Sequence, residues 1–122
     1  MPDTPTHRQF FGDQNYAFAL TPDLIIELER KTGTGIGGLC RRLFAGNFSH
    51  VEVLETIRLA LIGGGAEPET ASALVVTYAA SAPLGETFPL AVAILETAWF
   101  GATSEETAVR ASTDEKGQTD GR

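Results

Sequence analysis

Residues 20–65 read LTPDLIIELERKTGTGIGGLCRRLFAGNFSHVEVLETIRLALIGGG, and this stretch contains start and stop signals for three helices. Thr21-Pro22-Asp23 begins the first helix, with a hydroxyl N-cap, proline at the first helical position and an acid in the first turn. Gly33 follows two basic residues and is typical of a helix C-terminus. The chain is therefore predicted to be helical from its first fifth onward.

Two more helices follow within the same stretch. Apolar residues recur at helical spacing between Ile36 and Phe44, which predicts a short second helix. Ser49 and Glu52 have the spacing of a capping box, which predicts the start of a third helix. The three glycines at 63–65 end it, because glycine is a poor helix former.

A hairpin and two further helices flank this stretch. Apolar residues alternate with alanines from Tyr16 to Leu20, which predicts a strand that pairs with residues 9–11 across a turn at residues 12–15. On the other side, a fourth helix is expected to start near Pro68-Glu69 and a fifth around Phe88-Pro89.

The predicted fold is mainly α: a small N-terminal β-hairpin followed by a compact bundle of four to five short helices, α+β at most. We expect a flexible N-terminus at residues 1–7, a single helical domain with its hairpin at residues 8–101, and a flexible acidic tail at residues 102–122. The tail is rich in Thr, Ser, Glu, Asp and Gly. Such a segment buries too little apolar surface to offset the entropy of ordering it.

Composition excludes several classes of function. The 122 residues carry 9 Lys or Arg and 16 Asp or Glu, for a formal charge of −7. Most of the excess lies in the second half, where residues 63–122 hold three bases and nine acids. A protein that binds nucleic acid through its phosphates needs a basic face, so we expect no nucleic-acid partner. One cysteine cannot form an internal disulfide or a cysteine-based zinc site, and two histidines are too few for most transition-metal sites, so we expect no metal. We also expect no cofactor.

The sequence also contains no targeting or membrane signal that we recognise. The first six residues are polar, and the most apolar stretches are far shorter than the ~20 residues needed to cross a bilayer. We expect a cytoplasmic protein that does not bind membranes.

Gly33-Thr34-Gly35-Ile36-Gly37-Gly38 matches the letters of the dinucleotide-binding pattern G-x-G-x-x-G. That pattern needs a strand before the glycines and a helix N-terminus that receives the pyrophosphate. The preceding segment is predicted to be a helix, so we interpret these glycines as a joint between two helices.

The cysteine and the two histidines do not have the sequence pattern of a catalytic site. Cys40 lies on the apolar stripe of the second helix, which is typical of a small buried hydrophobe. His50 follows the predicted N-cap and His7 lies near the N-terminus, so we interpret both as solvated surface residues. We therefore expect no catalytic residue and no enzyme.

The charged residues have ordinary structural interpretations. Glu52 has a capping role, and Glu55 precedes Arg58 by three residues, as in a common surface pair. Arg30-Lys31 suits the negative end of a helix dipole, and Arg41-Arg42 is interpreted as a solvated face.

The aromatic residues indicate a binding surface better than the charged residues do, because several of them fall at or near predicted helix ends. These are Phe44, Phe48, Tyr78, Phe88, Trp99 and Phe100. Most aromatics enter the core of a small domain, but short helices cannot cover all of them. We predict a partner-binding surface near Phe44, Phe48, Trp99 and Phe100.

Three segments carry a resemblance to a known family: the strand from Tyr16 to Leu20, the quoted residues 20–65, and PLAVAILETAWFG at residues 89–101. From Phe10 to Gly101 the chain resembles the phage-tail-assembly-chaperone-like proteins of gene transfer agents, a tail protein family of phage-like particles that package host DNA. The matching positions are helix starts, helix stops and core residues, so the resemblance implies no active site.

The resemblance implies a non-catalytic assembly chaperone whose partner is the tail tape-measure protein or the tail tube protein, with a homo-oligomer left open. Proteins of this family are also described as tail tube components. The alternative is therefore a structural tail component that is incorporated into the particle. A tube subunit normally needs an extensive β-sheet to form rings, and a single predicted hairpin favours the chaperone.

Overall fold

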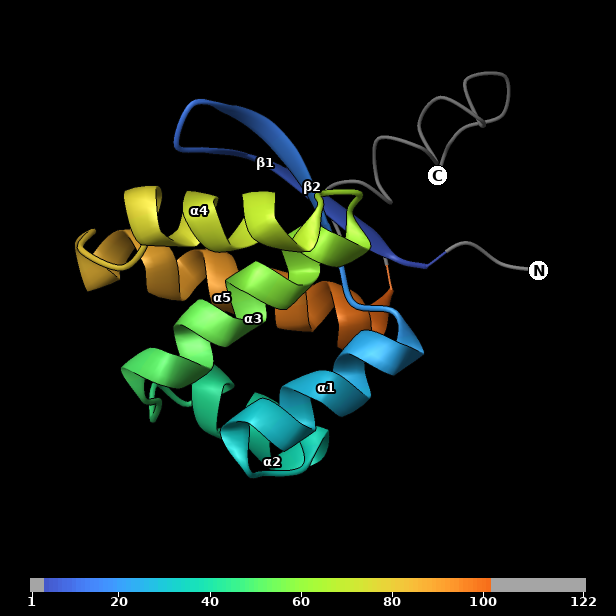
Figure 1. The fold of residues 1–122 in the computed structure, drawn as a ribbon. Helices are drawn as coiled ribbons and strands as arrows, with labels where there is room; N and C mark the ends of the chain where they lie inside the picture. Colours follow the sequence, from blue (N-terminus) through green and yellow to red (C-terminus); the bar gives the residue numbers. More distant parts are fainter. Residues whose placement is uncertain (1–3, 102–122) are drawn as a thin grey trace, which may run out of the picture.

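The computed structural model describes residues 4–101, in which one β-hairpin precedes five helices (Figure 1). Strands β1 (Thr6–Phe11) and β2 (Gln14–Ala19) pair antiparallel. The helices are α1 (Pro22–Thr32), α2 (Ile36–Phe44), α3 (His50–Gly63), α4 (Pro68–Tyr78) and α5 (Leu84–Phe100). This arrangement confirms the predicted, mainly helical α+β fold. The tail predicted at residues 102–122 lies outside the described residues.

The local signals in residues 20–65 act as predicted. The Thr21 hydroxyl accepts a hydrogen bond from the Leu24 N–H at 3.3 Å, and Gly33 ends α1 in the left-handed conformation at φ 72°. At the start of α3, the Ser49 hydroxyl accepts from the Glu52 N–H at 3.2 Å, and the Glu52 carboxylate accepts from the Ser49 N–H at 3.0 Å. Both helix starts therefore have their free backbone N–H groups partly satisfied by side chains.

The hairpin is longer and its turn tighter than the sequence indicates. Thr6 pairs with Ala19 and His7 with Phe18, so the fold begins two residues before the expected boundary at residue 8. The ladder sets this start, because it extends to the end of β2 and holds His7 opposite a buried Phe18. The turn has only two residues between the strands, and Gly12 there has φ 71°, a conformation that glycine adopts without strain.

Helix α5 begins earlier than the predicted start around Phe88-Pro89, so that prediction was wrong. Pro83 occupies the N-cap position, and its carbonyl accepts the Glu86 N–H at 2.9 Å, which starts the helix at Leu84. Pro89 then falls inside the helix and cannot donate to the carbonyl of Gly85. Gly85 is exposed, so the missing hydrogen bond falls at the surface of the molecule, close to the start of the helix.

Helix α3 is the centre of the molecule. It contacts β2, α1, α4 and α5, and Figure 1 shows it between the hairpin at one end and α1 with α2 at the other. Its apolar residues are therefore distributed around the helix rather than on one stripe, as expected of a buried helix. The buried residues of α3 are Glu52, Val53, Thr56, Ile57, Leu59, Ala60 and Leu61.

The C-terminal end of α3 lies directly against the backbone of β2. A Cβ atom at Gly63 would lie 1.8 Å from the Ala19 carbonyl oxygen, and one at Gly64 would lie 1.8 Å from the Ala17 carbonyl oxygen. Real atoms cannot approach so closely, so only glycine fits at both positions. These glycines do more than end the helix, since their missing side chains let helix and strand make backbone contact.

We predict that Gly64→Ala lowers the free energy of unfolding by about 2 kcal/mol or more, because the added methyl group must displace strand backbone. Gly37→Ala is the matched control, since a Cβ at that position in α2 meets no atom within 4 Å. The control variant is expected to be as stable as the parent or up to about 1 kcal/mol more stable. Urea unfolding measures both, and equal stability of the two variants would contradict the proposed backbone contact.

Candidate functional site

The aromatics predicted to form one partner surface do not all lie together. Phe44 is the last residue of α2 and is 39% exposed. Phe48 lies in the α2–α3 connection and stacks on Phe88 of α5, with ring centroids 4.3 Å apart and an interplanar angle of 13°. Phe48 is therefore partly buried and used mainly for packing between the α2–α3 connection and the second turn of α5.

Trp99 and Phe100 end α5 and are the most open of the predicted residues, 54% and 73% exposed. A helix rises 1.5 Å per residue, so Trp99 lies about 16 Å along the axis from Phe88. The structure therefore brings Phe48 to one end of α5 and leaves Trp99 and Phe100 at the other. We call the pair Trp99 and Phe100 the α5 terminal surface.

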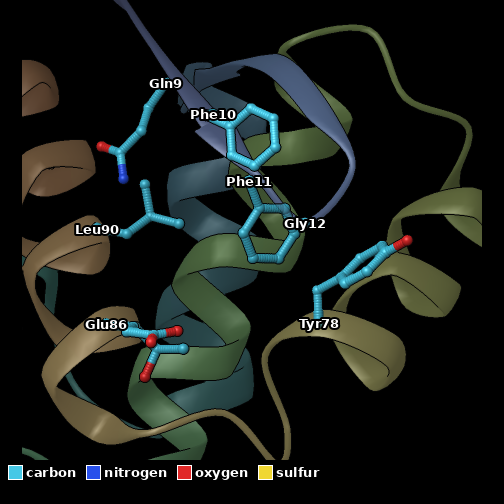
Figure 2. A pocket seen from close by; sticks show the side chains of 8 residues that line it. Gln9, Phe10, Phe11, Gly12, Tyr78, Glu86 and Leu90 are labelled. Atoms are coloured by element: carbon cyan, nitrogen blue, oxygen red, sulfur yellow. The ribbon is translucent and has the colours of Figure 1, made fainter.

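A pocket that the sequence did not indicate lies between β1, the end of α4 and the first turns of α5. Its volume is about 370 Å³. Figure 2 shows Leu90 and Glu86 of α5 on one side and Tyr78 of α4 on the other. The lining residues are Gln9, Phe10, Phe11, Gly12, Tyr78, Glu86, Thr87 and Leu90.

The alternation of side chains along β1 could have indicated one residue of this pocket. Successive strand residues face opposite sides, so Phe10 and Phe11 cannot both enter the core. In the structure Phe11 is buried, whereas Phe10 is 60% exposed at the pocket rim. The Tyr78 ring crosses the turn so closely that a Cβ at Gly12 would lie 2.3 Å from it. That long-range contact has no counterpart in the sequence pattern.

The glycine joint is a structural connection, as predicted. Gly33 caps α1, and the Ile36 N–H at the start of α2 donates to the Glu29 carboxylate at 2.8 Å. A carboxylate thus lies at the helix N-terminus where a pyrophosphate would have to bind, and like charges repel. This geometry does not suit a dinucleotide phosphate.

The buried thiol also matches the prediction. Cys40 is 2% exposed in the core, and burial raises its pKa to about 11. The thiol is therefore protonated at neutral pH and unsuited to nucleophilic attack.

The histidines lie in different settings from each other. His50 is exposed, as expected, with its Nε2 3.3 Å from the Ala80 carbonyl oxygen. His7 was expected in a loose segment but lies in β1, half-buried, with Nε2 2.8 Å from the Gln9 side-chain oxygen. Its ring is held there because His7 pairs with Phe18 across the hairpin.

Arg42 departs from its predicted role on a solvated face. Its guanidinium donates to both oxygens of the nearly buried Glu52 carboxylate, at 3.0 and 2.5 Å, and also to the Asn47 carbonyl at 3.3 Å. Arg41 remains exposed. The pairing links α2 to the capping box of α3, and it lowers the pKa of Glu52, chiefly through the hydrogen bonds from Arg42.

The other charged pairs are local. Glu55 and Arg58 form the predicted ion pair within α3 at 2.6 Å. Glu27 and Arg30 form a similar pair within α1 at 2.6 Å. In residues 4–101 no group of three or more His, Cys, Asp or Glu side chains is arranged to hold a metal ion.

No helix in the described part of the chain combines the length and the apolar character needed to span a membrane.

The site thus belongs to a small, mainly helical domain that has exposed aromatic side chains at one helix end and a pocket beside its hairpin. Residues 4–101 match the model of the family described as phage tail tube protein, GTA-gp10. The chain belongs to this gene transfer agent tail family. No curated protein and no solved structure gives a match. Membership of a tail family implies contact with other tail components.

The Arg42–Glu52 pair predicts that the stability of the folded protein decreases at acidic pH. The pKa of Glu52 is lowered in the folded state, so ionised Glu52 stabilises the folded protein. This contribution to the free energy of unfolding is complete above the unfolded-state pKa of about 4.3, and it is lost as the pH falls through the lower folded-state pKa. We expect Glu52→Gln to reduce stability at pH 7 and to make stability depend less on pH in the acid range. Urea unfolding between pH 7 and pH 2 measures both effects.

The Glu55–Arg58 pair provides the comparison for this experiment, because it lies within one helix and links no second element. Glu55→Gln is expected to cost less stability at pH 7 than Glu52→Gln. If Glu52→Gln kept the pH dependence of the parent, the Arg42 pairing would not be the source of acid sensitivity.

Proposed function

We propose that this protein is a non-catalytic structural component of the tail of a gene transfer agent, made in the cytoplasm and then incorporated into the particle. The observation that carries the proposal is the extent of the family match, since residues 4–101 are all the residues that the structure describes. The family is described as a tail tube protein, which supports incorporation better than a transient helper role.

The arrangement of apolar side chains supports this proposal. The α5 terminal surface offers two large, exposed aromatic side chains at consecutive positions of one helix end, and buried aromatics dominate the binding energy of many protein interfaces. Charge supports it too, because a net charge of −7 keeps an unassembled subunit soluble before it meets its partners.

The second candidate is an assembly chaperone that binds the tape-measure protein, the tail tube protein or both. One observation favours it: in residues 4–101 the sheet has only two strands, whereas ring-forming tube subunits normally contribute an extensive sheet. The two candidates differ in where the protein is found after assembly.

Mass spectrometry of purified particles, beside co-purification from the producing cells, separates the two candidates. We expect the protein in purified particles at many copies, because a structural component stays where it is assembled. A protein that is abundant in the lysate and missing from particles would contradict the structural proposal and favour the chaperone. A capsid protein serves as the positive control, and a cytoplasmic chaperone of the host as the negative control.

The α5 terminal surface yields a second test. We expect Trp99→Ala combined with Phe100→Ala to reduce incorporation into particles, or co-purification with a tail protein, by about tenfold or more. Both side chains are more than half exposed, so the stability cost is expected to be about 1 kcal/mol or less.

Val76→Ala is the control for this experiment, because Val76 is 69% exposed on α4 and apolar as well. If the folded double variant were incorporated normally, the α5 terminal surface would not be a contact with other tail proteins.

A further inference from the structure

The pocket between β1, α4 and α5 is separate from the α5 terminal surface. Leu90, which lines the pocket, lies nine residues before Trp99, about 13 Å along the helix axis. Its volume of about 370 Å³ is at the small end of the range typical of ligand pockets. A space of this size suits one large side chain with its adjoining peptide better than a cofactor.

The Thr87 hydroxyl is the polar atom of this pocket that most clearly needs a partner. Thr87 is only 2% exposed, and its hydroxyl has no hydrogen-bond partner. A buried hydroxyl without a partner costs free energy, so such groups are uncommon in native proteins.

Other threonines in the described helices satisfy their hydroxyls locally. Thr32, Thr56 and Thr97 each donate to the carbonyl four residues earlier, at 2.7, 2.7 and 2.9 Å. For Thr87 the corresponding carbonyl belongs to Pro83, which already accepts two backbone N–H groups at the start of α5. The usual partner is thus occupied, and the hydroxyl is left for a group that enters the pocket.

Gln9 supplies a second polar contact, from the hairpin side. Its side-chain oxygen is engaged by His7 Nε2 at 2.8 Å, which leaves its amide N–H₂ group as a donor. Figure 2 shows this amide nitrogen directed toward the space between β1 and Leu90. An amide donor at this point suits a peptide carbonyl of the bound segment.

Charge selects the kind of side chain that enters. Residues 63–101 contain four acids, Glu67, Glu69, Glu86 and Glu96, and no base. Glu86 lines the pocket and lies in the first turn of α5. Arg8 of β1 does not line the pocket. Glu86 is the one charged side chain among the residues that line the pocket, so the wall carries a negative charge and favours a cation.

The aromatic residues favour a planar cation over a compact one. Phe10, Phe11 and Tyr78 form much of the wall, and a guanidinium stacks on aromatic rings more readily than an ammonium group does. We propose that this pocket binds an arginine side chain presented by a peptide segment of a partner tail protein. The guanidinium pairs with the Glu86 carboxylate and donates to the Thr87 hydroxyl, while the Gln9 amide donates to a carbonyl of the same segment.

This binding would serve a structural tail component and an assembly chaperone equally, so its test does not depend on the proposed function. The probe is N-acetyl-L-arginine amide, titrated into the ¹⁵N-labelled full chain and followed by NMR. We expect chemical-shift changes at the backbone amides of Gln9, Gly12 and Leu90. The dissociation constant is expected to lie in the millimolar range and to rise with added salt. The corresponding lysine, glutamine and norleucine amides are expected to bind more weakly.

Two variants and a matched control complete the experiment. We expect Thr87→Val and Glu86→Gln each to weaken binding of the arginine amide about five- to tenfold, because the first removes a hydrogen bond to the guanidinium and the second removes the negative charge that pairs with it. Thr87→Val is expected to fold at least as stably as the parent, since it removes a buried unpaired hydroxyl and keeps the side-chain shape. Thr97→Val is the control, since the Thr97 hydroxyl is already bonded within α5 and lies outside the pocket.

The proposal is overturned if the arginine amide shifts no resonance of the pocket, or if the glutamine or norleucine amide binds as well as arginine. It is also overturned if Thr87→Val and Glu86→Gln bind the arginine amide as the parent does. A loss of stability in Thr87→Val that exceeds the loss in Thr97→Val would show that the hydroxyl has a partner within the protein.

Discussion

The contact between the end of α3 and the backbone of β2 is the constraint on which the rest of the structure depends. Gly63 and Gly64 lie where any side chain would overlap the carbonyl oxygens of Ala19 and Ala17. A two-stranded hairpin is marginal on its own, so it needs a surface to lie on. Because α3 also contacts α1, α4 and α5, this one contact fixes the hairpin relative to the helical bundle. The pocket exists only because the hairpin is held there, since β1 supplies one of its walls.

The sequence predicted the features that depend on neighbouring residues. The Thr21 cap, the Gly33 stop and the capping box of Ser49 with Glu52 are local, because each involves residues within one helical turn. The alternation of residues 16–20 likewise predicted a strand. These signals were enough to give the order of the elements and the mainly helical class.

Other features were missed or misplaced, some of them because they depend on contacts between distant residues. The start of α5 was placed too late because Pro89 was taken as a helix start, whereas it lies inside the helix. Arg42 was assigned to a solvated face because its partner Glu52 lies ten residues away across a turn. Phe48 lies away from Trp99 and Phe100 because it stacks on Phe88, and no periodicity contains that contact. The unpaired Thr87 hydroxyl appears only once the carbonyl of Pro83 is seen to be occupied.

The backbone contact of Gly63 and Gly64 also has a consequence for the order of folding. The hairpin is synthesised before α3, α4 and α5, yet the surfaces that cover it belong to those later helices. Contacts between distant parts of the chain form late, since the intervening segment must first be ordered. The strand pair is therefore expected to emerge from the ribosome without a surface to lie on, and to become stable only after Gly64 has been added and α3 has formed. In this fold, the hairpin is made before the helices but is among the last elements to become stable.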